Sequence, residues 1–284
     1  MSRTATIGLA QLTARLYDPE ENRRLATQAV QQLFLGGADL VVLPELMSSG
    51  YGSDQAQLEA AAEPIDGPTV RAWQAAAGRS DGLVAGGLCE REGDRIYNTA
   101  VLVDGDDVLL HYRKLHLFAE EKLRFTPGDK GLPVAETRLG VLGLCICYDL
   151  RFVETVRALA LQGAEVIAVP TAWLPGFDRE RWDAAGYAPQ ARGALLQANL
   201  DQVYIACASQ AGSNGESDFL GSSLLCDPYG KVVLGPLAGS RTELSAATVD
   251  LDDVRRAHER EPLIKPLADR RTDVYGLAVG GHVL

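Results

Sequence analysis

The chain has 284 residues, of which 46% are hydrophobic and 23% are charged, a composition typical of a soluble globular protein. Its net charge of -11 disfavours a binding surface for nucleic acid or for an anionic membrane. No apolar run approaches the roughly 20 residues of a membrane span, and the N-terminal residues lack the apolar core of a signal peptide. The five cysteines are scattered and odd in number, which fits a reducing compartment, so we expect a cytoplasmic protein.

The first half of the chain alternates apolar runs with amphipathic segments. Alternating or continuous apolar runs predict strands, and apolar residues that recur at helical spacing predict helices. A polar loop is expected over residues 114–131. The predicted strands are 4–12, 39–43, 82–88, 96–103 and 108–111, with a hairpin turn at 104–106, and the predicted helices are 19–35 and 68–79.

The second half repeats this alternation. Strands are predicted at 141–147, 165–169, 203–208, 219–226, 231–234 and 244–249, and helices at 153–161, 191–200 and 251–258. About a dozen strands with about four or five long helices favour an α/β fold in which two sheets carry helices on their outer faces. No linker or repeat interrupts the chain, so we predict one domain over 1–260 and a tail, 261–284, that lies over a surface or a partner.

Cys147 lies where a predicted strand meets a predicted helix. The apolar run from Val141 ends there, and helical spacing begins at Val153. Such a junction presents a side chain at the sheet edge, close to a helix N-terminus and to free backbone N–H groups. These surroundings lower the pKa of a thiol and can hold an oxyanion, which predicts a nucleophile. The alternative, a small buried apolar residue, stays open at this point because most free cysteines are buried.

Two more strand ends carry charged residues. Glu45 follows an apolar strand and a proline, where burial would raise its carboxyl pKa and suit it to act as a general base. Lys114 follows the hairpin strand, and its compact ammonium is suited to stabilise an oxyanion. Glu121 is a candidate second carboxylate beside Lys114, and the adjacent Glu120 is the alternative. Taken singly, each of these residues could equally be a solvated surface charge.

The strand-end sequences form a set. They are DLVVLPEL at 39–46, YRKLHLF at 112–118 and GLCICYDLRFVE at 143–154. Together they resemble the nitrilase superfamily of carbon–nitrogen hydrolases, and the resemblance covers nearly the whole chain. It implies a four-layer α-β-β-α sandwich with a Glu–Lys–Cys triad at strand ends. Further matching stretches are RIYNTA at 95–100, FTPGD at 125–129, the proline–tryptophan loop at 170–173, and FLGSSLLCDPYGKVV at 219–233.

The resemblance implies a role for each matching residue. Glu45 becomes the general base and Cys147 the nucleophile, while Lys114 stabilises the oxyanion together with the backbone N–H of Tyr148. The second glutamate of the family falls seven positions after the lysine, at Glu121. No cofactor and no metal are implied, and the spacing of the four histidines matches no metal-binding motif.

The residues around the cysteine bear on the substrate. Nitrilases resemble Cys-Trp-Glu at this point and this chain has Cys-Tyr-Asp, which favours an amide or ureido substrate over a nitrile. Val153 stands where the family has a proline, and we expect little structural effect from it. The most favoured activity is hydrolysis of a small primary amide by way of a thioester. The alternatives are a hydrolase of N-carbamoyl compounds, a nitrilase, an acyl transferase and a binding protein that has lost its chemistry.

Aromatic residues near the strand ends are candidate pocket walls, although each could equally belong to the core. Asp149 is expected to brace the turn after the cysteine by pairing, and so is Arg151, for which contact with a substrate carboxylate is the alternative. His111 and His116 flank the lysine and are expected to be hydrogen-bonded loop residues. The resemblance further implies a homodimer or larger assembly, with the tail as an interface arm. The candidate wall residues are Tyr51, Phe118, Trp173, Phe177 and Tyr187.

Overall fold

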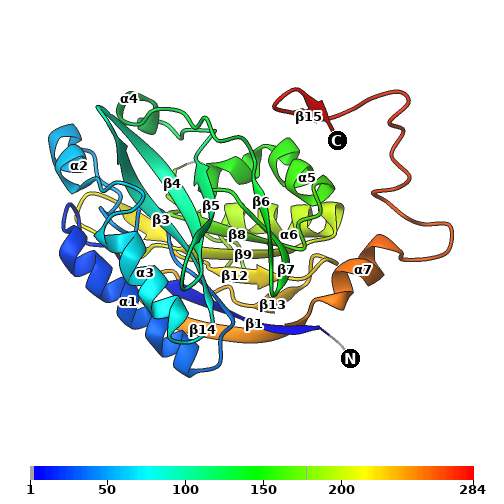
Figure 1. The fold of residues 1–284 in the computed structure, drawn as a ribbon, viewed down its shortest axis with the longest axis horizontal. Coiled ribbons are helices and arrows are strands. Elements are labelled where there is room, and N and C mark those ends of the chain that lie inside the picture. The colour runs from blue at the N-terminus through cyan, green and yellow to red at the C-terminus, as the bar shows by residue number, and fades with distance from the viewer. Residues whose placement is uncertain (1–2, 177) are drawn as a thin grey trace.

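The structure is a computed structural model that describes residues 3–176 and 178–284. In this part of the chain, two six-stranded sheets form the centre of the molecule (Figure 1). The first has the order β14-β1-β2-β3-β4-β5 and the second β13-β12-β9-β8-β7-β6. The strands of the first sheet are β1 (Thr4–Gln11), β2 (Leu40–Val42), β3 (Leu83–Glu92), β4 (Arg95–Val103), β5 (Val108–Arg113) and β14 (Glu243–Asp250). Those of the second are β6 (Val134–Thr137), β7 (Gly140–Leu144), β8 (Val166–Thr171), β9 (Tyr204–Ser209), β12 (Leu224–Cys226) and β13 (Val232–Leu234).

Helices cover the outer faces of both sheets. In Figure 1, α1 and α3 lie on one side of the pair of sheets, and α5 and α6 lie on the other. The predicted four-layer α-β-β-α arrangement is thereby confirmed. The helices of the described residues are α1 (Pro19–Leu35), α2 (Gln55–Ala61), α3 (Pro68–Gly78), α4 (Glu121–Arg124), α5 (Val153–Leu161), α6 (Pro189–Asp201) and α7 (Asp252–His258). None of them is long and apolar enough to cross a membrane.

Strand alternation explains how the first sheet serves two cores. Leu40 and Val42 of β2 belong to the apolar cluster that also contains the second sheet. Val41, between them, packs in the cluster formed with α1 and α3. Successive side chains of a strand point to opposite faces, so the same short strand seals both layers. The apolar alternation that predicted the strands is thus the pattern that stacks the four layers.

The topology brings several strand ends to one edge. Strands β1, β2 and β3 are parallel, and β7, β8 and β9 are parallel in the second sheet. Because β4 is antiparallel to both β3 and β5, β5 runs in the same direction as β3. The carboxyl ends of β2 and β5 therefore lie at the same edge of the first sheet. This is the edge where the predicted Glu45 and Lys114 follow their strands.

Several predicted elements need correction. The strand expected over 219–226 is two strands, β11 (Asp218–Leu220), which pairs with β10 (Ala211–Ser213), and β12. The break falls at Gly221 and Ser222, whose φ angles of 58° and 56° leave the extended region. The loop expected over 114–131 contains α4, and the prediction missed β6 and α2 altogether. The bounds of α1 agree with the predicted 19–35.

The tail after α7 differs from the rest of the chain. Figure 1 shows it running away from the sheets in a wide arc and ending in the hairpin of β15 (Ala278–Val279) and β16 (His282–Val283). Large apolar side chains are exposed along it, among them Leu263 at 92% and Val283 at 76%. The prediction that residues 261–284 form an interface arm stays a prediction.

Candidate active site

Glu45 is buried at the end of the first sheet. It follows β2 and Pro44, and its side chain has no exposed surface. Its backbone N–H donates to the Thr171 carbonyl at the end of β8 (3.2 Å), and Gln210 Nε2 donates to the Glu45 carbonyl (2.9 Å). A methyl group on Gly87 of β3 would lie 2.6 Å from Glu45 Cα, so the close approach of the two segments requires glycine there. Both sheets thus hold this residue in place.

Lys114 lies directly after β5 and reaches the carboxylate of Glu45. Its Nζ donates to Glu45 Oε1 (2.6 Å) and lies 2.8 Å from Glu121 Oε2. Asn98 supports both partners, since its carbonyl accepts from the Lys114 N–H (2.8 Å) and its Nδ2 donates to Glu45 Oε1 (2.7 Å). Glu45 Oε2 is buried and has no hydrogen-bond partner among the described residues. One carboxylate oxygen of Glu45 is therefore not engaged by any group of the described residues.

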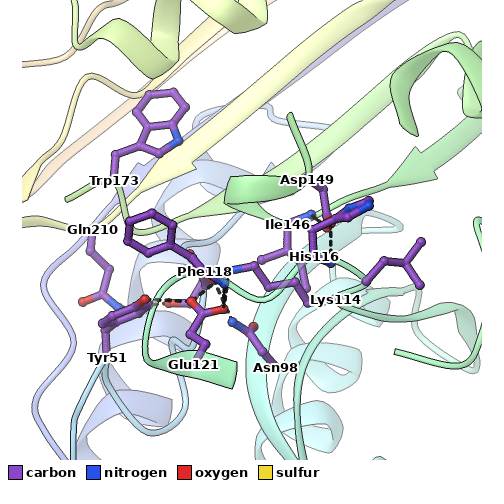
Figure 2. Close-up of polar contacts among 12 residues, drawn as sticks. Tyr51, Asn98, Lys114, His116, Phe118, Glu121, Ile146, Asp149, Trp173 and Gln210 are labelled. Atoms are coloured by element: carbon purple, nitrogen blue, oxygen red, sulfur yellow. Dashed lines mark hydrogen bonds and ion pairs between the residues drawn. The ribbon is translucent and has the colours of Figure 1, made fainter. Parts of the chain in front are cut away.

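Glu121, the first residue of α4, holds the other side of the lysine. Its Oε1 accepts from Tyr51 Oη (2.7 Å) and its Oε2 accepts from the Phe118 N–H (3.0 Å). Figure 2 shows Tyr51, Glu121 and Lys114 joined in one run of polar contacts. Glu120 points elsewhere: its side chain is 70% exposed and pairs with Arg124 (2.7 Å). Of the two adjacent glutamates, the structure brings Glu121 to the lysine.

Cys147 is presented by a turn of the second sheet. The strand β7 ends at Leu144, earlier than predicted, and Cys147 opens a 3-10 helix (Cys147–Arg151) that leads into α5. Its φ is +46°, in the left-handed region that side chains other than glycine rarely adopt. Strain of this kind persists where the surrounding structure imposes it, and it occurs often at functional sites. Unlike the buried Cys145, Cys147 is partly exposed.

Burial and charge set the protonation of these groups. Burial raises the pKa of the Glu45 carboxyl, and the Lys114 charge opposes that rise. Burial acts to lower the pKa of the Lys114 ammonium, but the carboxylates of Glu121 and Glu45 outweigh it and raise that pKa. Burial, followed by the Glu45 charge, raises the pKa of the Cys147 thiol well above its ordinary value, and Lys114 acts against them. The expected lowering of this pKa is therefore wrong, because desolvation outweighs the favourable charge.

Asp149 connects the cysteine turn to the segment after Lys114. Its Oδ2 accepts from the Ile146 N–H (2.9 Å) and from Tyr112 Oη (2.7 Å). Its Oδ1 accepts from the His116 N–H (3.1 Å) and contacts His116 Nδ1 (2.8 Å), and Figure 2 shows Asp149 beside His116 and Ile146. Asp149 thus braces the turn as predicted. Arg151 forms an ion pair with Asp178 (2.7 Å).

A pocket opens beside Cys147, and the predicted wall residues Tyr51, Phe118, Arg151 and Trp173 all line it, together with Tyr148. Phe177 lies outside the described residues. Tyr187 packs against the core and stacks with Arg192 (4.0 Å from its guanidinium carbon to the ring centre). Residues that sequence reasoning missed at the site are Asn98, within the matching RIYNTA stretch, and Leu174, Gln190 and Gly193 of the pocket wall.

The two histidines beside the lysine make hydrogen bonds, as expected. His111 Nε2 contacts Glu90 (2.8 Å), and His116 contacts Asp149. In the described part of the chain, no group of three or more histidine, cysteine, aspartate or glutamate side chains is arranged to hold a metal ion.

Comparison with known proteins gives the family. A curated nitrilase of Pyrococcus abyssi is 32% identical over 95% of this chain and 98% of its own. An (R)-stereoselective amidase of Pseudomonas sp. is 33% identical over 95% of this chain and 93% of its own. A mutant amidase of Nesterenkonia sp. AN1, which carries the acetamide moiety of fluoroacetamide covalently at its active site cysteine, is 29% identical with a TM-score of 0.74 over 96% of both chains. The carbon–nitrogen hydrolase family profile matches residues 3–259, so this chain belongs to the carbon–nitrogen hydrolases of the nitrilase superfamily.

Proposed function

We propose that the protein hydrolyses a small primary amide to its acid and ammonia by way of a thioester on Cys147. One observation carries the proposal: Lys114 Nζ is held between Glu45 Oε1 (2.6 Å) and the Glu121 carboxylate (2.8 Å). This leaves Glu45 Oε2 without a partner among the described residues. The Glu45 charge raises the pKa of the Cys147 thiol and the Lys114 charge lowers it, which supports treating the three residues as one site.

In the first half-reaction the thiol needs a base, because its raised pKa keeps it protonated. Glu45 takes the Cys147 proton, and the sulfur bonds to the amide carbon. The carbonyl oxygen becomes an oxyanion, which the Lys114 ammonium and the Tyr148 N–H stabilise. The tetrahedral intermediate then breaks its C–N bond, and protonated Glu45 returns the proton to the nitrogen. Ammonia leaves, and the acyl group stays on the sulfur.

In the second half-reaction water replaces ammonia. Glu45 takes a proton from water, and the oxygen bonds to the thioester carbon. The C–S bond breaks, the acid leaves, and the proton on Glu45 returns to the Cys147 thiolate. A site that passes the same proton in both directions needs a carboxyl pKa near the working pH, and burial raises the pKa of Glu45 in that direction.

Glu121 has a supporting part in this proposal. It contacts the same ammonium as Glu45, and both of its oxygens are engaged by Lys114, Tyr51 and the Phe118 N–H. These contacts keep the ammonium charged and fix its direction. We therefore assign Glu121 a positioning role and assign proton transfer to Glu45.

The choice of an amide substrate rests on two supports. The sequence after the nucleophile is Cys-Tyr-Asp, unlike that of nitrilases, and two of the similar proteins above are amidases. The Pyrococcus abyssi relative, a nitrilase, favours a nitrile as the second candidate. Measuring ammonia release from short aliphatic amides, N-carbamoyl amino acids and nitriles side by side separates the three substrate classes.

The decisive variant is Cys147→Ala. We expect it to fold and to release no ammonia from any amide that the wild type hydrolyses, because the bond-forming sulfur is gone. Cys145→Ala is a matched control, since Cys145 lies two residues earlier and is buried in the core. Wild-type protein incubated with a substrate and quenched in acid should show the acyl mass on the peptide of Cys147. Near-normal hydrolysis by folded Cys147→Ala would overturn the mechanism.

A further inference from the structure

One wall of the pocket beside Cys147 is a face of α6. Gln190 and Gly193 of this helix line the pocket together with Leu150, a residue of the turn that begins at Cys147. Gln197, on the same face one turn further along α6, donates from Nε2 to the Leu150 carbonyl. The helix face is therefore hydrogen-bonded directly to the turn that begins at Cys147.

Gly193 leaves the wall open. It lies within α6, where a glycine is less favourable than any residue except proline. A methyl group built on Gly193 meets no atom within 4 Å. Because Gly193 lines the pocket, a side chain at this position would take up pocket space. The absent side chain thus leaves room in the pocket beside Cys147.

The chemistry of this wall is neutral. Among the described residues that line the pocket, Arg151 has the one charged side chain, and that charge faces Asp178 at 2.7 Å. A carboxylate on the substrate would have to compete with Asp178. Gln190 donates from Nε2 to the Leu174 carbonyl (3.3 Å), and its Oε1 is buried with no hydrogen-bond partner in the described part of the chain. A buried acceptor of this kind is matched by a ligand that brings a donor.

We propose that this α6 wall is the acyl-chain site, that it takes an extended, uncharged acyl group, and that Gly193 sets the length of that group. Gln190 Oε1 accepts a hydrogen bond from an acyl group that carries a hydroxyl or amide. This inference rests on the proposed function, because it assigns the acyl half of the amide that Cys147 attacks.

The test compares substrates of different length and charge. The kcat/KM is measured for acetamide, butyramide, pentanamide, hexanamide, 5-hydroxypentanamide and the carboxylate-bearing glutaramate. In the wild type we expect hexanamide to exceed acetamide and glutaramate. In Gly193→Leu the ratio of kcat/KM for hexanamide to that for acetamide should fall by about tenfold or more, since loss of room for a few methylenes discriminates to this extent. Gly193→Ala should give a smaller fall in the same direction.

Two further variants refine the test. Leu196→Ala changes a 61% exposed side chain of the same helix and should leave the substrate ratios as they are in the wild type. Gln190→Leu should lower the preference for 5-hydroxypentanamide over pentanamide. A wild type that prefers glutaramate would overturn the inference. So would Gly193 variants whose kcat/KM falls by the same factor for every amide, or does not fall for any.

Binding without turnover separates this inference from the proposed function. Hexanamide and acetamide are titrated against Cys147→Ala and against the double variant Cys147→Ala, Gly193→Leu. Hexanamide should bind more tightly to the first protein and lose that advantage in the second. If the wild type hydrolysed no amide while this pattern held, the proposed function would fail and the acyl-chain site would stand. If hexanamide bound no more tightly than acetamide to either protein, the acyl-chain site would be excluded.

Discussion

The two sheets supply the site with different kinds of group. The first sheet contributes Glu45 and Lys114, which are 0% and 1% exposed and are fixed by hydrogen bonds at both ends. The second sheet contributes Cys147, partly exposed on a turn with a φ of +46°. Buried charges in fixed positions stabilise a developing charge without reorganising. In the proposed mechanism the sulfur has to meet a substrate that arrives from solvent, and the pocket beside Cys147 provides that access.

Hydrogen bonds join the edges of the two sheets that carry the site. The Glu45 N–H reaches Thr171 of the second sheet, and Gln210 Nε2 reaches back to the Glu45 carbonyl. On the other side of the lysine, Asp149 binds His116. The comparison therefore predicts that variants of the first sheet affect charge and chemistry together, whereas variants of the second sheet affect mainly geometry.

Lys114→Met should have the largest effect. It leaves Glu45 and Glu121 buried side by side without a cation, and removing one partner of a buried ion pair costs about 3–5 kcal/mol. Ammonia release should fall to background because the oxyanion loses its charge partner. Denaturant unfolding and an ammonia assay measure the two effects, and Lys122→Met, an exposed lysine on α4, is the control.

The stability loss of Lys114→Met should depend on pH. Without the cation, burial holds the folded-state pKa of Glu45 above its unfolded value, so folding favours the protonated acid. That contribution is fully present below the unfolded pKa and is lost as pH rises through the folded pKa. The deficit relative to the wild type should therefore be smaller in acid than at neutral pH. A deficit that grows in acid would contradict this account of the buried charges.

Glu45→Gln should change the chemistry and the charge of the site together. Hydrolysis should fall by about 10²–10⁴-fold, the usual contribution of a general base. The Glu45 charge raises the pKa of the Cys147 thiol, so removing it should lower that pKa. Alkylation of Cys147 by iodoacetamide, followed by mass spectrometry over a range of pH, should then begin at lower pH than in the wild type. The outcome against this prediction is a variant that still hydrolyses amides or whose thiol titrates at higher pH.

Glu120→Gln is the matched control for that variant. Glu120 pairs with Arg124 at the surface, and we expect neither the hydrolysis rate nor the alkylation profile to move. The pair of variants compares the buried Glu45 with the exposed Glu120.

The sequence predicts the position of a strand-end charge better than its surroundings. Glu45, Lys114 and Cys147 each follow an apolar run, and parallel strand ends meet at one edge, which local patterns are able to indicate. Glu121 and Glu120 are neighbours of one type, and only the start of α4 at Glu121 turns one toward Lys114 and leaves the other outside. That choice depends on tertiary packing, which composition does not contain.

The errors have the same origin. The sequence predicts a lowered thiol pKa from the nearby helix N-terminus alone. It does not reveal the desolvation of the sulfur, which raises that pKa. Gln190 and Gly193 were missed because the apolar pattern of α6 says nothing about the turn at Leu150, some 40 residues earlier, against which the helix packs. Contacts between distant segments decide these features.

Asp149→Asn should test the geometry of the second-sheet turn. The amide nitrogen cannot accept, so one pair of hydrogen bonds is lost, either to Ile146 and Tyr112 or to His116. We expect a loss of about 1.5–3 kcal/mol in unfolding free energy and a fall of about 10- to 100-fold in kcat, because the sulfur is displaced. The alkylation profile of Cys147 should move much less than in Glu45→Gln. A profile that moves as far would place Asp149 among the charge partners of the sulfur.

Removal of residues 261–284 should have the smallest effect on chemistry. The tail runs away from both sheets, and its apolar side chains are exposed, Leu263 at 92% and Val274 at 70% (Figure 1). We predict that these side chains are buried against a second copy of the chain, so sedimentation should give a smaller assembly for the truncated protein than for the full chain. Hydrolysis per chain should change by less than about threefold, because the groups around Cys147 all precede the tail. Equal masses for both proteins would exclude the tail as an interface arm and leave its exposed apolar surface to another partner.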